Sequence, residues 1–209
     1  QLIVHGTDRN DAIAKMREAL NGFVIRGISS NIPFQAALLA HPKFVSGDFN
    51  TGFIAENYAH GFRAEDVPHH DPDFLVALAA FVRRKSRERA ANLSGQLPGY
   101  DVQIGHDYSV VVLGAKGANR YIPVHVDEFR GQSGKAIIKV GDNHYIIESH
   151  SRLNDVRISG TVNGKPFTAQ VERGTPKNPL ALQIQMLLDY PIVLIYLIQA
   201  HQDKAVLRV

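Results

Sequence analysis

The sequence predicts an α+β protein in which helices come first and an antiparallel β-sheet follows. Apolar residues recur at spacings of three and four in three segments before residue 94, which is the period of a helix with one buried face. From residue 100 onward, short runs alternate polar with apolar residues between turn signals, which is typical of strands. With 209 residues and 44% hydrophobic content, the chain can form one large domain or two small ones.

The first helix is expected to follow an opening apolar strand, LIV. Asp8 can cap this helix, and Gly22 ends it. Residues 23–25, FVI, are then predicted to form a brief buried strand. The apolar positions expected on the buried face of the helix are Ile13, Met16, Leu20 and Phe23.

A second helix is predicted from Ile32 to Ala40. Asn31 is a suitable N-cap, and Pro33 is tolerated in the first turn because no backbone donor is needed there. This helix is expected to bury Phe34 and Leu38 and to stop at His41-Pro42. Residues 43–71 are rich in glycine and aromatic residues without a sustained period, and are predicted to be a connector lying across a surface.

The strongest helix signal is DFLVALAAFVRRKSRERAANL, residues 73–93. Acidic residues stand at its start and basic residues fill its later turns, which suits the helix dipole at both ends. Its apolar stripe consists of Phe74, Leu78, Phe81 and Val82.

Seven candidate strands follow within about 75 residues. They are YDVQI, DYSVVVL, RYIPVHV, KAIIKV, HYIIES, DVRISGTV and PFTAQV. Gly141-Asp142-Asn143 and Asn163-Gly164 are tight hairpin signals because these residues accept positive φ. The spacing leaves no room for crossover helices, so the sheet is expected to be an antiparallel barrel or sandwich, with the long helix packed against it or inside it.

Composition excludes several classes of protein. The chain has no cysteine, so a disulfide framework, a zinc ribbon and a cysteine nucleophile are excluded. The net charge of +3 is ordinary, and no stripe of basic residues interleaved with aromatics indicates nucleic-acid binding. The longest apolar run, PIVLIYLIQA, is half of the roughly 20 residues that a membrane span needs. The chain opens on an apolar run without a signal peptide or a starting Met, which is typical of a piece cut from a longer chain.

No short motif yields a catalytic constellation. His69-His70 with Asp71 and Asp73 resembles a metal cluster, but adjacent histidines point apart, and a helix start explains the acids better. GAKGAN at 114–119 is predicted to be a hairpin loop rather than a phosphate cradle, and GQSGKA at 131–136 fails the P-loop pattern. The carboxylates Asp101, Asp107 and Glu128 lie in different strands or loops, so nothing pairs them as acid and base.

The basic run from Arg83 to Arg89 has three readings. A solvated helix face is favoured over a nucleic-acid or acidic-lipid site, and the third reading is a polar contact surface for a partner chain.

The first quarter of the chain, HGTDRNDAIAKMREALNGFVIRGISSNIPFQAALLAHPKFVSGDFNTGFI, closely resembles the last segment of biotin carboxylase, the ATP-dependent component of biotin-dependent carboxylases. Its ending, FVSGDFNTGFIAENYAHGF, looks more like the α subunit of propionyl-CoA carboxylase than its methylcrotonyl-CoA or acetyl-CoA relatives. The stretch TVNGKPFTAQVERGTPKNPLAL is similar to later strands of that family.

This resemblance implies two domains. Residues 1–60 would be the helix-strand-helix end of a biotin carboxylase domain. Residues 61–209 would be the domain that docks the α subunit onto the carboxyltransferase β subunit, called the BT domain, with a long helix packed in an antiparallel β-barrel. The tail after residue 182 departs from the family pattern.

The resemblance also implies a function within a larger enzyme, a ligase that carboxylates propionyl-CoA to methylmalonyl-CoA with ATP and bicarbonate. The expected partners are the carboxyltransferase β subunit and the remainder of the α subunit, without nucleic acid or membrane, in the bacterial cytoplasm or, less favoured, the mitochondrial matrix. Biotin would sit on a carrier domain, and ATP and Mg²⁺ in the carboxylase part, both outside this chain; no catalytic, cofactor-binding or metal residue is expected within it. The residues expected to contact the β subunit are Arg83, Arg84, Arg87, Leu97, Pro98 and Tyr100.

Three alternatives stay open at this point. They are a stand-alone small β-barrel that binds a ligand or lipid, a basic nucleic-acid-binding module, and the α subunit of another acyl-CoA carboxylase such as the methylcrotonyl-CoA type.

Overall fold

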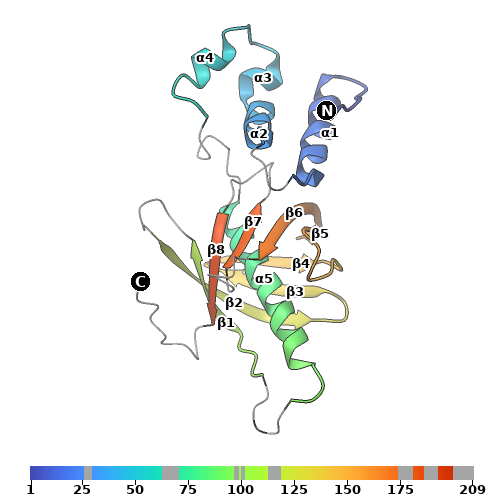
Figure 1. The fold of residues 1–209 in the computed structure, drawn as a ribbon, viewed down its shortest axis with the longest axis vertical. Helices are drawn as coiled ribbons and strands as arrows, with labels where there is room; N and C mark the ends of the chain where they lie inside the picture. The colour runs from blue at the N-terminus through green and yellow to red at the C-terminus, as the bar shows by residue number, and fades with distance from the viewer. Residues whose placement is uncertain are drawn as a thin grey trace. The chain divides into compact units, whose positions relative to one another are not determined.

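The protein divides into two compact units, each described here by itself (Figure 1). The first comprises residues 1–71 with 185–192, and the second comprises residues 72–184 with 193–209. The computed structural model describes residues 1–25, 30–62, 71–96, 99, 102–112, 119–173, 181–185 and 193–199.

The first unit is helical in its described residues. It contains α1 (Arg9–Gly22), α2 (Ile32–Ala40), α3 (Pro42–Ser46) and α4 (Phe53–Asn57). Asp8 caps α1 as predicted, because its carboxylate accepts a hydrogen bond of 2.9 Å from the Asp11 backbone N–H. Asn31 precedes α2 but makes no side-chain cap, and only its backbone carbonyl accepts a hydrogen bond, from the Gln35 N–H.

Helices α1 and α2 share a small apolar core. It consists of Ile13, Leu20, Ile32 and Leu39, against which Leu2, Met16 and Phe44 pack. The predicted face of α1 is confirmed at Ile13 and Leu20. In α2 the buried face is different from the prediction, since Phe34 and Leu38 are only half-buried.

The two strands predicted in this unit are wrong. Residues 2–4 and 23–25 have no strand structure, and Phe23 is 43% exposed. A strand needs a neighbouring backbone with which to exchange hydrogen bonds, and no described strand pairs with either segment. Apolar β-branched composition alone was therefore a misleading signal.

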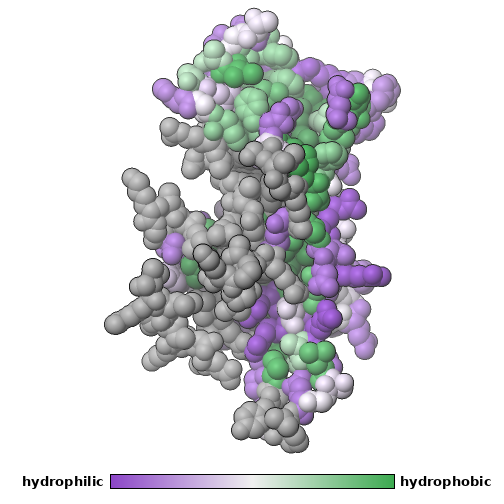
Figure 2. Space-filling view, in the orientation of Figure 1, coloured by the Kyte–Doolittle hydropathy of each residue, from purple (hydrophilic) through white to green (hydrophobic). Residues whose placement is uncertain are grey.

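The segment predicted to be a plain connector is instead organised by aromatic contacts. The Phe44 and Phe49 rings stack at 5.0 Å, and the Arg9 guanidinium lies 4.9 Å from the Phe44 ring centroid. The His41 ring meets the Phe53 ring edge-on at 4.9 Å. Hydrophobic residues gather on this unit at the top of Figure 2, and several of them, Val45, Phe49 and Ile54, are exposed.

The second unit is a closed antiparallel barrel wrapped around one helix. The described strands pair in sequence order, and β8 pairs back to β1 to close the barrel. The helix is α5 (Pro72–Ala91), as predicted from its sequence. The strands are β1 (Asp107–Val112), β2 (Arg120–Arg130), β3 (Lys135–Val140), β4 (Asn143–Glu148), β5 (Arg157–Val162), β6 (Lys165–Arg173), β7 (Ala181–Gln185) and β8 (Val193–Gln199).

Six of the seven predicted strands are confirmed, and the first, YDVQI, is wrong. Residues 102–104 of that segment have no strand structure, while Tyr100 and Asp101 lie outside the described residues. Two further strands, β7 and β8, were not predicted. Strand β8 lies within the apolar run PIVLIYLIQA, for which no strand was predicted. No described helix is long and apolar enough to cross a membrane.

The first half of α5 is buried on every side. All nine residues from Phe74 to Val82 are buried, so the helix lies inside the barrel and not merely against it. Inward-facing strand residues complete the core, and the Phe74 ring meets the Phe167 ring of β6 edge-on at 5.2 Å. The apolar stripe predicted for this helix was too narrow, because a helix enclosed by a barrel has no solvent face.

Both predicted hairpin turns are present. Gly141 has φ +58° between β3 and β4, and Asn163 and Gly164 have φ +49° and +79° between β5 and β6. GQSGKA forms the turn from β2 into β3. In this turn Gly134 has φ +63°, and a Cβ added to it would lie 2.3 Å from the Ser149 carbonyl oxygen. GAKGAN joins the paired strands β1 and β2, but residues 113–118 lie outside the described part of the chain.

Candidate docking site

The second half of α5 carries the basic run, and three of its cations bind backbone carbonyls of the barrel unit. In Figure 1 these last turns extend beyond the strands. Arg84, Lys85 and Arg87 are only partly exposed, because each reaches sideways to a neighbouring segment. The solvated-face reading therefore fits only part of the run.

Arg84 has only 12% of its side chain exposed. Its Nη1 donates to the Gly105 carbonyl at 3.1 Å, and its Nη2 lies 3.5 Å from Glu88 Oε2. The guanidinium also lies 5.5 Å from the centroid of the Phe129 ring. These contacts tie the helix to strand β2 and to the segment that leads into β1.

Lys85 points to the other side of the helix. Its Nζ donates to the carbonyls of Ser151 at 2.7 Å and Ser149 at 3.3 Å. Burial lowers the pKa of the Lys85 ammonium, and the Asp155 charge opposes that shift. Lys85 thereby holds the segment that follows β4.

Arg87 and Arg83 differ in their contacts. The Nη2 of Arg87 donates to the Gln103 carbonyl at 3.1 Å. Arg83 is half-buried, and desolvation lowers the pKa of its guanidinium, with repulsion from Arg87 as a second cause. Leu97, Pro98 and Tyr100, the remaining residues predicted to contact a partner, lie outside the described residues.

Gln96 binds the end of the helix, and no sequence pattern predicts this contact. Its Nε2 lies 2.9 Å from both the Ala90 and Ala91 carbonyls at the end of α5, where backbone carbonyls lack the regular helical donors. The Ala90 carbonyl also accepts from the Leu93 N–H at 3.4 Å. Its Oε1 accepts a hydrogen bond of 3.2 Å from the Val102 N–H. No standard capping pattern marks a Gln at this distance from the helix end, so only the folded chain reveals the contact.

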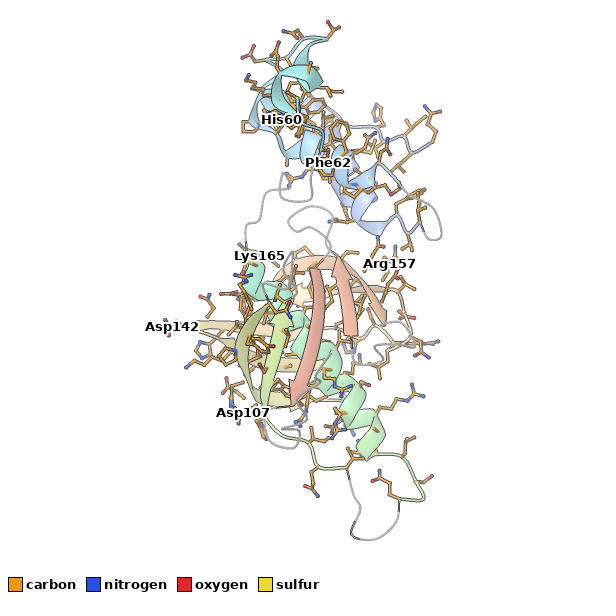
Figure 3. The ribbon with its side chains drawn as sticks, turned by 60° about the vertical axis from the view of Figure 1, so that its left-hand side comes forward. His60, Phe62, Asp107, Asp142, Arg157 and Lys165 are labelled. Atoms are coloured by element: carbon orange, nitrogen blue, oxygen red, sulfur yellow. The ribbon has the colours of Figure 1, made fainter. Side chains whose placement is uncertain are left out.

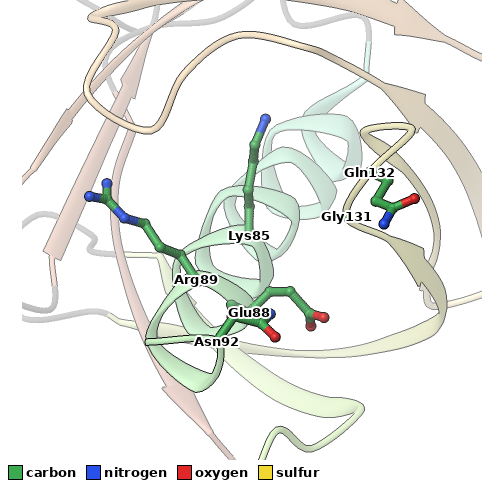
Figure 4. Close-up of a pocket in the computed structure, with 6 residues that line it drawn as sticks. All are labelled: Lys85, Glu88, Arg89, Asn92, Gly131 and Gln132. Atoms are coloured by element: carbon green, nitrogen blue, oxygen red, sulfur yellow. Dashed lines mark hydrogen bonds between the residues drawn. The ribbon is translucent and has the colours of Figure 1, made fainter. Parts of the chain in front are cut away.

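A polar hollow of about 440 Å³ lies beside this end of α5 (Figure 4). Four of its lining residues project from the helix side and two belong to the turn between β2 and β3. They are Lys85, Glu88, Arg89 and Asn92, and Gly131 and Gln132. Leu93, which follows the lining residue Asn92 in the sequence, is 59% exposed.

The described carboxylates form no acid and base pair. Asp107, which Figure 3 shows at the end of the barrel where β1 begins, lies 2.6 Å from His125 Nδ1. Glu128 pairs with Arg130, and Asp101 lies outside the described residues. Each described carboxylate of the three thus has a cationic or imidazole partner and serves no visible chemistry.

Across the described part of the chain, no three His, Asp or Glu side chains come together as metal ligands. Asp73 instead accepts a hydrogen bond of 3.1 Å from Asn143 Nδ2, and His69 and His70 lie outside the description. Neither Met16 nor Met186 precedes a lysine, so the chain has no Ala-Met-Lys-Met segment to carry biotin.

Comparison with known proteins matches both units of the chain. The model of the propionyl-coenzyme A carboxylase BT domain matches residues 75–185, which is more than half of the chain and spans α5 and β1 to β7. The chain belongs to this BT domain family. A second model, the biotin carboxylase C-terminal domain, matches residues 1–56, ahead of the BT domain.

Individual relatives agree with these matches. The chain is 39% identical over 107 residues, or 51% of its length, to the propionyl-CoA carboxylase alpha chain of Ruegeria pomeroyi. It is 30% identical over 82% of its length to the mitochondrial propionyl-CoA carboxylase alpha chain of Caenorhabditis briggsae. It is also 52% identical over 54 residues to biotin carboxylase 1 of Bacillus subtilis. The aligned region covers only 16%, 24% and 12% of these three relatives, so this chain spans a small part of their length.

Proposed function

We propose that this chain is part of the α subunit of a biotin-dependent propionyl-CoA carboxylase and that its BT domain docks this subunit onto a carboxyltransferase β subunit. The observation that carries the proposal is the match of the BT family model to the helix-in-barrel unit. The barrel interior is filled by α5, which disfavours the alternative of a barrel that binds a small ligand. The cations Arg84, Lys85 and Arg87 donate to backbone carbonyls, which disfavours a nucleic-acid site on the same helix.

The whole enzyme would carboxylate propionyl-CoA to methylmalonyl-CoA with ATP and bicarbonate. Support comes from the relatives, which are named propionyl-CoA carboxylase alpha chains. Biotin, ATP and Mg²⁺ would be held by other parts of the α subunit, since the sequence has no Ala-Met-Lys-Met segment and the described residues form no metal-ligand cluster. Relatives occur in bacteria and, by name, in mitochondria, which supports the bacterial cytoplasm or the mitochondrial matrix, the cytoplasm being favoured.

The docking surface we propose is the end of α5 and the chain that follows it. Leu93 supplies an exposed apolar side chain there, and Leu97, Pro98 and Tyr100 would extend it. Apolar and aromatic anchors at the centre of an interface carry most of its binding energy. Arginine is also enriched at interfaces, and Arg83 would flank the anchors.

The test is co-purification of the full α subunit with the β subunit. Replacing Leu97 and Tyr100 together by Asp should abolish the complex, because two charges would be buried at the interface without partners. The thermal midpoint of the α subunit should change little. Tyr121→Asp is the matched control, since Tyr121 is 67% exposed on β2, and this variant should still bind. Wild-type recovery of the β subunit by the double variant would refute the proposed surface.

A further inference from the structure

We infer that Gln96, Arg87 and Arg84 are positioning residues. Their hydrogen bonds, together called the latch, hold residues 102–106 along α5 and so fix Gln96 and Val102, the two residues that flank 97–101. The inference rests on the proposed docking function and deepens it. It also gives the arginines a role different from direct contact with the partner. The described residues on each side of 97–101 carry the argument.

Gln96 joins the two ends directly. Its amide group donates to the last carbonyls of α5, at Ala90 and Ala91, while its amide oxygen accepts from the Val102 N–H. One side chain thus satisfies exposed groups of the helix end and binds the first residue after 97–101. Removing it would release the helix end and Val102 together.

The two arginines continue the latch along the returning segment. Arg87 donates to the Gln103 carbonyl and, one turn earlier on the helix, Arg84 donates to the Gly105 carbonyl. Charge-assisted hydrogen bonds of this kind are stronger than neutral ones. The contacts run in opposite order along the two segments, since the later arginine binds the earlier carbonyl, as expected for a segment that runs back along the helix. The same contacts explain why 102–105 is not a strand, because its carbonyls are bound by the helix.

The far end of the segment is fastened to the barrel. The Val126 N–H donates to the His106 carbonyl at 2.8 Å, and the His106 ring lies with Nδ1 2.7 Å from the Val126 carbonyl, to which it donates. Residues 102–106 are therefore held by α5 on one side and by β2 at the end. Ordering a loop before binding lowers the entropy that is lost on binding, so a latch at its base strengthens docking without touching the partner.

The experiment uses the full α subunit and purified β subunit, with two measurements. Amide hydrogen exchange at Val102 reports the latch, and the dissociation constant reports docking. The test variants are Gln96→Met, which removes both hydrogen-bonding atoms, and Arg87→Met, with Arg87→Lys as the conservative variant. Arg157→Met is the matched control, since Arg157 is exposed on β5 and lies outside the proposed docking surface. Exchange at Ile138, buried in β3, must stay unchanged as proof of an intact barrel.

In Gln96→Met we expect Val102 to exchange at least about fivefold faster, the factor that corresponds to a hydrogen bond of about 1 kcal/mol. We expect the dissociation constant to rise about tenfold in Gln96→Met and Arg87→Met, to be largely restored in Arg87→Lys, and to stay unchanged in Arg157→Met. Lys restores a donor to the Gln103 carbonyl, although with a less rigid geometry.

Two results would overturn the inference. Weaker docking with unchanged exchange at Val102 would mean that Gln96 contacts the partner directly. Faster exchange with unchanged docking would mean that the latch is structural only. Failure of the proposed function is a separate outcome, because it would appear as a wild-type α subunit that does not bind the β subunit at all. If the wild type binds and the Leu97→Asp, Tyr100→Asp double variant alone fails to bind, the proposed docking surface is supported and the positioning role of Gln96 and Arg87 is refuted.

Discussion

Phe81→Ala tests whether α5 lies inside the barrel. Phe81 is 1% exposed, and its ring lies 6.0 Å from the Phe129 ring of β2. Removing the ring takes about 150 Å² of apolar surface out of the core, which at roughly 25 cal/mol per Å² costs about 4 kcal/mol. Large-to-small changes of buried aromatic residues cost about 3 to 5 kcal/mol, so the free energy of unfolding of the barrel unit should fall by this amount.

The assay is urea unfolding followed by near-ultraviolet circular dichroism, to which the buried rings of Tyr108 and Tyr145 contribute. Leu93→Ala is the control, because Leu93 is exposed beyond the end of the helix and its loss should cost less than about 0.5 kcal/mol. A loss below about 1 kcal/mol for Phe81→Ala would show that the helix packs outside the sheet, and the reasoning from burial would fail.

Two further predictions concern the turn into β3 and the pH dependence of stability. Gly134→Ala should destabilise the barrel by about 2 to 3 kcal/mol in the same assay, because the added Cβ would collide with the Ser149 carbonyl and the residue has positive φ. Gly95→Ala is the control, since Gly95 has φ +84° in open space and its substitution should cost only about 1 kcal/mol. Equal losses in the two variants would contradict the role assigned to the collision. Burial lowers the pKa of Lys85 in the folded protein below its ordinary value of 10.5. Between the folded-state and unfolded-state pKa values the unfolded chain binds more protons, so the free energy of unfolding should rise with pH. Plots of this free energy against pH for wild type and Lys85→Met should therefore differ in slope just below pH 10.5, and parallel plots would show that the pKa is not lowered.

The sequence was most informative where a local pattern and the tertiary contacts agree. Asp8 caps α1 through its own neighbour, and Asn163-Gly164 turns the chain through its own backbone, so both could be predicted from a few residues. Strands β3 and β4 are joined by a two-residue turn and alternate buried with exposed residues, which gave their extent almost to the residue. The helix predicted over residues 73–93 likewise agrees with α5, because its residues have high helix propensity and its charges suit the helix dipole.

The errors arose where contacts between distant segments decide the structure. Residues 102–105 alternate like a strand, yet Arg84 and Arg87 bind their carbonyls from a helix some twenty residues earlier. Strand β8 pairs with β1 from the other end of the barrel sequence, which no local window reveals. In the candidate site the basic run was recognised, but which carbonyl each cation binds, and that Gln96 joins them, depends on the fold alone.

The pairing of β1 with β8 also sets an order for folding. The barrel cannot close until its last strand is available, and Tyr108 must find Gln199 across most of the unit's sequence. Such long-range pairing is slow, because loop-closure entropy is lost before the contact forms. Helix α5 precedes every strand of the barrel and is enclosed by them. During synthesis the ribosome releases α5 first, so the hairpins that follow can pack onto this helix one after another. Circular permutants that move α5 behind β8 would have to thread the helix into a nearly closed barrel, and their refolding should be slower while the final structure stays the same.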